Sequence, residues 1–298
     1  MRSSSSAYVH KNINLIWLNL ILFLLCSPII MINGGHKKKA SEHKKKSKGK
    51  VDPDAGKPLS STDFKHADKL DEKSSHLDNK MLYSLTKFEG DIEFGGKKRM
   101  KSAISNKILL WPKGEVKYSL SRHYSSKDRA AIAKAMKRFH RQTCIKFKPK
   151  VEHDSDYLYI RPAGGCWSFL GRYGGMQTLS LGEGCVHPSI VQHELMHALG
   201  FYHEQSRYDR DKYIKIIWHN IRRGAVAQFR KATRQEMDTL GEKYDYQSIM
   251  HYPAKAFSNG GGPTIVARKK GVQIGMAKKA DAIDIRKINK LYKCPGKH

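Results

Sequence analysis

A histidine–glutamate–histidine cluster near the middle of the chain has the residue types and spacing of a metal-dependent hydrolytic site. Residues 193–197 read His-Glu-Leu-Met-His. In an α-helix, positions i and i+4 lie on one face about one turn apart, so His193 and His197 can point their imidazoles at one metal ion. The carboxylate of Glu194 can then lie beside that metal without occupying a coordination position.

A third ligand cannot come from the same straight helix. His203 lies ten residues after His193, which is about 15 Å along a helix axis, whereas a zinc–nitrogen bond is only about 2 Å long. The helix must therefore end, and Gly200 lies where a helix C-terminus would need positive φ. Three histidines would leave a fourth position for water, which is typical of a catalytic zinc site. The alternative is a buried amphipathic helix with incidental histidines.

The extended pattern resembles the H-E-x-x-H-x-x-G-x-x-H zinc signature of the metzincins. The residue after the third histidine separates the branches, and Glu204 there makes the chain similar to the astacin family of zinc endopeptidases. The similarity extends from about Phe88 to Cys294. The other residues that carry it are Gly200, Phe201, 207–210 (Arg-Tyr-Asp-Arg) and 248–252 (Ser-Ile-Met-His-Tyr), which resembles the family's Met-turn.

The resemblance implies the chemistry of the site. His193, His197 and His203 are expected to bind one Zn²⁺ per subunit, and Glu194 is expected to take a proton from the zinc-bound water and deliver it to the leaving amine. Tyr252 is implied as a further metal ligand at rest that moves away to stabilise the oxyanion. The alternative for Tyr252 is that it only lines the wall of the site.

Three further residues are implied to have structural roles. Gly200 ends the zinc-binding helix, and Met250 packs beneath the metal without binding it. Glu204 lies near the new N-terminus that forms when the pro-segment is removed. Other histidines, including His140, His187, His219 and His251, belong to no motif and are expected on the surface or satisfied in the core.

The tetrapeptide at 88–91, Phe-Glu-Gly-Asp, resembles the F-x-G-D pattern of astacin pro-segments, whose aspartate is thought to replace the catalytic water on zinc. Asp91 suits this role because a carboxylate is a good zinc ligand, and Gly90 lets the backbone approach closely. An ordinary turn is the alternative. The basic run 97–101 offers a cleavage site, so we expect the mature chain to start near Ser102.

Five cysteines bear on the compartment of the protein. Cys26 lies in an N-terminal apolar run, and the other four fall in the expected catalytic part. An even number after a secretory segment indicates two disulfides, with three pairings open; free buried thiols are the alternative. The resemblance implies the pairs Cys144–Cys294 and Cys166–Cys185.

The chain is expected to have three parts: a signal peptide (1–35), a pro-segment (36–101) and a catalytic domain (102–298). Residues 13–32 are strongly apolar and are followed by a glycine pair at 34–35, which favours a secreted, extracellular protein. An uncleaved signal anchor is the alternative, since twenty residues can just span a bilayer. Residues 36–50 contain eight lysines and are interpreted as a solvated linker, with an adhesive tail as the alternative.

The net charge of +29 favours anionic partners. Residues 102–298 hold 36 Lys and Arg against 16 Asp and Glu, a net +20. We expect protein or peptide substrates, acidic or from the extracellular matrix, and contact with anionic polysaccharide. A well-solvated basic surface without such contacts is the alternative. Lys278 and Lys279 lie near where the astacin family builds the pocket for the residue after the cleaved bond, and the resemblance implies a preference for an acidic residue there. No nucleic-acid module is recognised, and a monomer is expected.

A non-catalytic extracellular binding protein on the same fold is the main alternative function. It would keep the architecture without hydrolysis, but the residues expected to be catalytic are all present. A basic adhesion or nucleic-acid-binding protein is a third class, which has the charge but no recognised module.

The expected fold is α+β with two lobes. The N-terminal lobe should hold a mixed twisted sheet and two helices, including the zinc-binding helix, and the C-terminal lobe should be largely irregular with one C-terminal helix. Alternation or β-rich composition predicts strands at 116–120, 145–147, 157–160 and 177–181, and helical spacing predicts helices after Ser125 and over 280–292. Residues 177–181 are expected to rim the cleft, and 164–167 are expected to be irregular.

Overall fold

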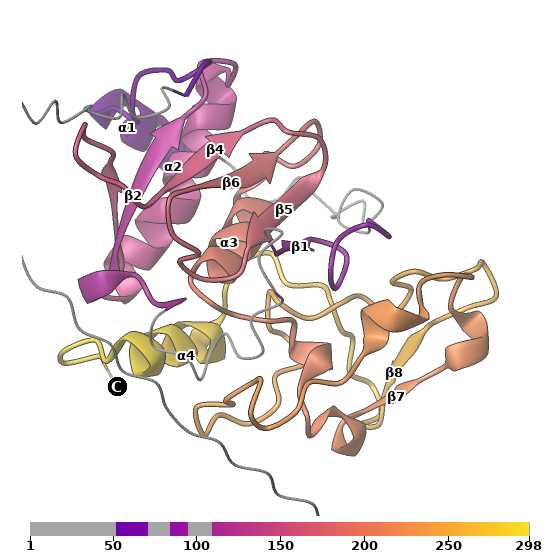
Figure 1. The fold of residues 1–298 in the computed structure, drawn as a ribbon. Coiled ribbons are helices and arrows are strands. Elements are labelled where there is room, and N and C mark those ends of the chain that lie inside the picture. Colours follow the sequence, from indigo (N-terminus) through magenta and orange to yellow (C-terminus); the bar gives the residue numbers. More distant parts are fainter. Residues whose placement is uncertain (1–51, 71–83, 95–108, 298) are drawn as a thin grey trace, which may run out of the picture. The chain divides into compact units, whose positions relative to one another are not determined.

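A six-stranded mixed sheet with strand order β1-β5-β6-β4-β2-β3 dominates the N-terminal lobe (Figure 1). β5 and β6 are antiparallel, and the other neighbouring strands are parallel. The computed structural model describes residues 52–70, 84–94 and 109–297. The strands are β1 (Ile92–Glu93), β2 (Glu115–Leu120), β3 (Lys146–Pro149), β4 (Tyr157–Arg161), β5 (Cys166–Phe169) and β6 (Met176–Leu181).

Two helices complete the core of this lobe. α2 (Ser126–Gln142) begins at Ser125, whose side chain accepts from the backbone of Asp128 while the Asp128 carboxylate accepts from the backbone of Ser125. This reciprocal cap satisfies N–H groups that would otherwise lack partners. α3 (Pro188–Ala198) is buried along its whole length. It carries the first two predicted metal ligands into the interior.

The C-terminal lobe has little regular structure, as expected. It contains the 3-10 helices η6 (Trp218–Asn220) and η7 (Val226–Phe229) and one α-helix, α4 (Ala282–Tyr292), which confirms the predicted C-terminal helix. A two-stranded antiparallel sheet, β7 (Ile214–Ile216) with β8 (Ile265–Ala267), was not expected. Both of its strands are short, so their alternation is too brief to stand out in the sequence.

Two expectations about the sheet were wrong. Residues 177–181 do form β6, but β6 lies between β5 and β4, so it cannot rim the cleft as an edge strand. Residues 166–167, expected to be irregular, begin β5 instead. Among the strands that follow residue 109, β5 is the one at this edge of the sheet. β1, from residues 92–93, pairs with it in parallel orientation.

A third helix, α1 (Ser61–Lys69), was missed because the sequence before residue 80 shows no clear apolar period. Its N-terminus is capped by Ser60 and Asp63. Figure 1 shows α1 beside α2. Only a few apolar residues of the region are buried, among them Leu59 and Ala67, which explains the weak sequence signal.

Two disulfides connect distant parts of the fold. Cys144, just after α2, is bonded to Cys294, just after α4, and Cys166 of β5 is bonded to Cys185 in the loop before α3. This is the pairing implied by the resemblance. Within the described ranges, no helix is both long enough and apolar enough to cross a membrane. The apolar run 13–32, the lysine-rich 36–50 and the basic run 97–101 lie outside the described residues.

Candidate zinc site

Three imidazoles converge on one point at the end of α3. The Nε2 atom of His193 lies 3.1 Å from Nε2 of His197 and 3.2 Å from Nε2 of His203. Ligand nitrogens about 2.0–2.1 Å from a tetrahedral zinc ion would be roughly 3.3 Å apart. All three side chains are buried. The spacing therefore fits a single zinc ion.

The turn that brings His203 back begins directly after α3. The backbone N–H of Phe201 donates to the carbonyl of Met196, and that of Gly200 donates to the carbonyl of His197. These two bonds form a Schellman motif, which requires a left-handed residue at the helix end. Gly200 supplies that residue with φ of +108°, and the chain then turns back toward the other two histidines.

The second ring nitrogen of each histidine is held by an oxygen acceptor. Nδ1 of His193 is 2.8 Å from the carbonyl of Ile249, and Nδ1 of His197 is 2.7 Å from the carbonyl of Phe201. Because a carbonyl only accepts, Nδ1 must carry the proton in both rings. The Nε2 lone pairs are then available to a metal, and the ring orientations are fixed.

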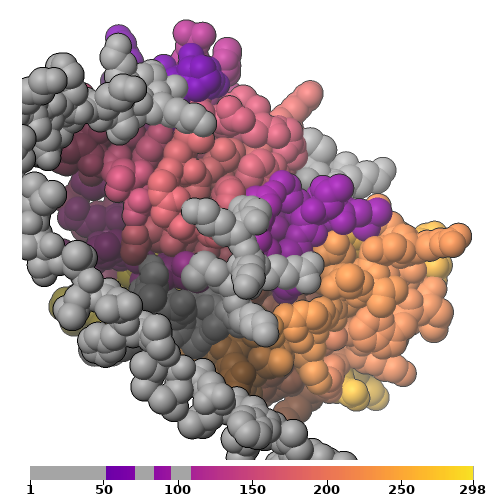
Figure 2. Space-filling view, in the orientation of Figure 1, coloured from indigo at the N-terminus to yellow at the C-terminus, as the bar shows by residue number. Residues whose placement is uncertain are grey.

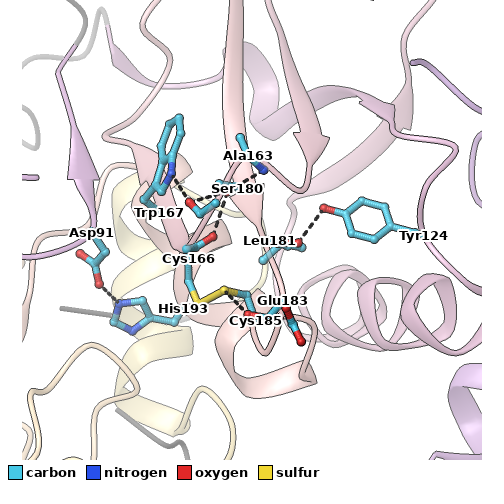
Figure 3. Close-up of a disulfide and its surroundings, with 12 residues drawn as sticks. Asp91, Tyr124, Ala163, Cys166, Trp167, Ser180, Leu181, Glu183, Cys185 and His193 are labelled. Atoms are coloured by element: carbon cyan, nitrogen blue, oxygen red, sulfur yellow. Dashed lines mark hydrogen bonds and ion pairs between the residues drawn. A yellow bond between two sulfur atoms is a disulfide. The ribbon is translucent and has the colours of Figure 1, made fainter. Parts of the chain in front are cut away.

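Asp91 is the fourth group at this point. Its carboxylate lies 3.2 Å from Nε2 of both His193 and His197 and 3.4 Å from Nε2 of His203. Figure 3 shows the carboxylate facing the His193 ring, next to the Cys166–Cys185 disulfide. Three nitrogens and one carboxylate oxygen make a donor set that suits four-coordinate zinc.

A tight backbone loop presents Asp91 to the histidines. Phe88 and Ile92 exchange two backbone hydrogen bonds, at 3.0 and 2.9 Å, so Asp91 is the last of the three residues in the loop that they close. Glu89 and Gly90 both have positive φ, 46° and 85°, which glycine accepts without cost and glutamate does not. Figure 2 shows residues 84–94, in purple, between the pink sheet surface and the orange C-terminal lobe.

Glu89 makes two contacts that the sequence did not predict. Its carboxylate lies 2.8 Å from Nδ1 of His203, and its carbonyl accepts a hydrogen bond from the Tyr252 hydroxyl. The Tyr252 ring also packs on His203, with ring centroids 4.6 Å apart. Residues 84–94 therefore engage both the third histidine and the tyrosine expected to assist catalysis.

The electrostatics of the cluster favour a cation. Burial acts to lower the pKa of His203, but the charges of Asp91 and Glu89 outweigh it and raise the pKa to about 9. Burial would raise the pKa of Asp91, yet His203 and His197 hold it well below its usual range. The two carboxylates thus favour positive charge at His203, whereas burial lowers the pKa of His197 to about 4, so that this ring is neutral and can offer its Nε2 lone pair to a metal.

Glu194 is fully buried beside the cluster. Burial, reinforced by the charge of Asp91, raises the pKa of Glu194 well above its ordinary value. Neither carboxylate oxygen has a hydrogen-bond partner among the described residues. A buried carboxylate with no partner is costly, and a raised pKa beside a metal site is the pattern of a general base or acid.

The predicted Met-turn lies under the first histidine and is held by α4. The carboxylate of Asp284 accepts from the Ser248 hydroxyl at 2.6 Å and from the backbone N–H of Ile249 at 2.9 Å. Met250 is 2 % exposed, and its carbonyl accepts from the backbone N–H of Glu204. Asp284 was missed as a site-supporting residue, although its spacing from Asp281 forms a capping box.

Glu204 is buried, and both of its carboxylate oxygens have hydrogen-bonding partners. Its carboxylate lies 2.6 Å from Nζ of Lys287 and 3.2 Å from Nη1 of Arg207, and it accepts from the backbone N–H of Asp245 at 2.8 Å. The expected proximity to a new N-terminus involves residues 102–108, which lie outside the described residues.

The histidines without a motif have local roles or are exposed. Nε2 of His140 accepts from the backbone of Phe147, His187 caps α3, and His251 is hydrogen-bonded to Tyr244. His219 is exposed. None of these histidines belongs to the candidate metal-binding group formed by Asp91, His193, His197 and His203.

The chain is similar to known zinc proteases. The profile of the astacin peptidase family matches residues 103–293. Zinc metalloproteinase nas-7 of Caenorhabditis elegans is 41% identical over 237 residues, which cover 80% of this chain and 62% of the relative. Zinc metalloproteinase nas-15 of the same organism is 44% identical over 236 residues, 73% of this chain and 41% of the relative. The chain thus spans about half of these relatives' length.

A solved structure shares the fold. It is high choriolytic enzyme 1, a hatching enzyme zinc-protease from Oryzias latipes. The similarity has a TM-score of 0.57 at 40% sequence identity and covers 63% of this chain and 92% of that chain.

Proposed function

Because this chain belongs to the astacin family of peptidases, we propose that it is a zinc-dependent metalloendopeptidase that is synthesised as a zymogen. The observation that carries the proposal is the convergence of Asp91 with the three histidines. The histidines would hold the metal, and Asp91 would hold it in the latent state in place of water. Zinc bound there would polarise a substrate carbonyl and make water more acidic.

The roles of the remaining residues follow from their positions. Glu194 would accept a proton from the attacking water and then donate it to the leaving amine, since it is buried beside the ligands and its carboxylate has no hydrogen-bond partner in the described part of the chain. Once the pro-segment leaves, the Tyr252 hydroxyl would lose the Glu89 carbonyl as its acceptor. In that state it would act as a metal ligand or donate to a developing oxyanion, as the family resemblance implies.

Removing the pro-segment must release several contacts at once. Asp91 has to leave the histidines, Glu89 has to leave His203 and Tyr252, and the pairing of β1 with β5 has to open. Cleavage in the basic run 97–101 would start this release. We propose that an extended peptide substrate then takes the edge of β5, because main-chain pairing at a free sheet edge is a general mode of peptide recognition.

Secretion and partners complete the proposal. Two disulfides suit an oxidising compartment, and residues 1–35 are proposed as the signal that directs the chain there. Substrates are proposed to be proteins or peptides, with an acidic residue after the cleaved bond favoured by the exposed Lys278 and Lys279. A monomeric state and contact with anionic polysaccharide stay predictions.

Substitution of Glu194 tests the catalytic proposal. In the processed protein, Glu194→Ala should lower kcat for peptide hydrolysis by roughly 10²–10⁴-fold, because general-base catalysis contributes about that much. Zinc content, measured by atomic absorption, should stay at the wild-type level because no ligand is changed. Glu183→Ala is the matched control, since Glu183 is an exposed glutamate in the loop just before α3. Equal turnover in wild type and Glu194→Ala would refute the role of Glu194, and absence of hydrolysis in the wild type would favour the non-catalytic alternative.

A further inference from the structure

Residues 52–70 lie against the catalytic part at a second place, well separated from the metal site along the sheet. The backbone of Gly56 donates to the carbonyl of Leu120 at 2.7 Å, and that of Arg122 donates to the carbonyl of Asp54 at 2.9 Å. These bonds are at the end of β2, whereas β1 pairs with β5 at the opposite edge. Figure 1 shows α1 beside α2 and β1 beyond β5, at the other end of the sheet. The contact is therefore independent of Asp91.

Each aspartate of this segment is bound by the catalytic part. The Tyr157 hydroxyl donates to Asp52 at 2.6 Å, and the Tyr159 hydroxyl donates to Asp54. The Ser121 hydroxyl also donates to Asp54, at 2.9 Å. Burial removes water from a carboxylate, and hydrogen bonds from hydroxyl donors offset part of the free energy that this costs.

Two cations of α2 bind the aspartates of α1. The Arg129 guanidinium donates to both carboxylate oxygens of Asp63, at 3.2 and 2.9 Å, and Nζ of Lys137 lies 2.5 Å from Asp68. Arg129 also donates to the carbonyls of Lys57 and Pro58, at 2.9 and 2.7 Å. A bidentate guanidinium–carboxylate pair is both stronger and more directional than a single charged contact.

Apolar and steric contacts complete the fit. Leu59 and Ala67, 8% and 1% exposed, join the core cluster of the catalytic part. Gly56 has no room for a side chain, because a Cβ there would lie 2.7 Å from Cα of Arg122. The surface that contacts residues 52–70 therefore favours a peptide with carboxylates at matching positions and with a glycine where the chains come closest. A basic protein that attracted any anion would not need this fit.

We propose that the surface formed by β2, β4 and the α1-facing side of α2 is a peptide-binding exosite for segments that carry spaced aspartates, and residues 52–70 occupy it in the uncleaved chain. Its carboxylate receptors are Tyr157, Tyr159, Arg129 and Lys137. Removal of the pro-segment opens it to aspartate-bearing segments of protein partners, away from the metal. The inference rests on the proposed function, because only a processed zymogen uncovers this surface.

Binding in trans tests the exosite. The processed protein, freed of residues 1–101, is titrated against a fluorescently labelled peptide of residues 52–70, and binding is followed by anisotropy. Saturable binding is expected, with a scrambled peptide of the same composition binding much more weakly. Arg129→Gln should weaken binding roughly tenfold, since it removes a bidentate pair. Lys127→Gln, which removes the same charge from an exposed position of α2, should have little effect.

A peptide variant covers the case in which the protein variant misfolds. Asp63→Asn in the labelled peptide leaves the protein untouched and should also weaken binding roughly tenfold. Equal binding of the native and scrambled peptides, equal losses for Arg129→Gln and Lys127→Gln, or no detectable binding would each overturn the exosite.

Turnover of a short peptide substrate, measured in the same samples, separates the exosite from the proposed function. Turnover should persist at saturating 52–70 peptide; complete inhibition would place the peptide in the active site and overturn the exosite. Peptide binding without any turnover would refute the proposed function and leave the exosite standing.

Hydrogen exchange on the uncleaved chain supplies a readout that needs no processing. Arg129→Gln should speed exchange at the amides of residues 61–69 and leave those of residues 88–92 unchanged, because the two regions are held by separate contacts. Unchanged exchange at 61–69 would contradict the claim that Arg129 holds this segment.

Discussion

Individual side chains decide the chemistry of this protein, and their roles depend on second partners as much as on the metal. Each metal-facing histidine is oriented through Nδ1, by two backbone carbonyls and by the carboxylate of Glu89. The H-E-x-x-H spacing predicted that His193 and His197 point to one side, and Gly200 with His203 predicted the return of the third histidine. The two carbonyl partners could not be predicted, because a backbone carbonyl has no sequence signature.

Asp91 offers a residue-scale prediction about latency. In the uncleaved chain, Asp91→Ala should raise peptide hydrolysis above the wild-type level, since it removes the carboxylate that faces the three histidines. The control is Glu93→Ala, which removes a carboxylate two residues away that pairs with Lys87 instead. Hydrolysis by the purified, uncleaved variants is measured with a quenched fluorescent peptide. If Asp91→Ala stays as silent as the wild type, latency does not depend on this carboxylate.

The buried carboxyl group of Asp245 leads to a prediction about how the stability of the fold depends on pH. Burial, with the charge of Asp284 adding to it, raises the pKa of Asp245 to about 7, compared with about 3.9 in an unfolded chain. The folded state therefore binds this proton more tightly, so the stabilising contribution is present below about pH 4 and is lost as pH rises through 7. Asp245→Asn removes this ionisable group, so the free energy of unfolding of the variant does not fall with pH on account of residue 245.

The melting temperature tests that prediction. The Tm of Asp245→Asn minus that of the wild type should increase between pH 4 and pH 8, measured by scanning calorimetry. Glu152→Gln, at an exposed carboxylate, should show a flat difference. A difference for Asp245→Asn that falls with pH would show that this carboxyl is not held protonated in the fold.

At the level of elements, local patterns gave the helices and strands but not their arrangement. The alternation at β2 and the capped start of α2 depend on neighbouring residues, so the sequence predicted them. Strand order depends on contacts between distant residues, which explains the error in placing β6 at the rim. The short β7 and β8 and the mostly polar α1 carry too little periodicity to be recognised.

The turn after α3 gives a prediction at this scale. Gly200→Ala should destabilise the fold by about 1–3 kcal/mol, because a side chain is strained at positive φ, and it should weaken zinc binding by displacing His203. Gly241→Ala is the control, since Gly241 also has positive φ and an added Cβ there would meet no atom within 4 Å. Urea unfolding and zinc titration distinguish the two effects. A loss of stability without any loss of zinc affinity would show that the turn does not position His203.

In the molecule as a whole, residues 52–94 contact residues 109–297 at two separate places among the described ranges. Residues 84–94 enter the metal site and extend the sheet at β5, and residues 52–70 lie on the far strands and on α2. The Cys144–Cys294 disulfide connects the ends of α2 and α4. Because α4 also holds the Met-turn, the two lobes are coupled directly at the site.

The coordination of zinc in the uncleaved chain tests the central claim most directly. Zinc X-ray absorption of the purified full-length protein should show one zinc per chain bound by three imidazole nitrogens at about 2.0–2.1 Å and one carboxylate oxygen at about 2.0–2.2 Å. In Asp91→Ala the oxygen should change to that of water while the three nitrogens remain. Absence of zinc, or a shell with fewer than three imidazoles, would contradict the account.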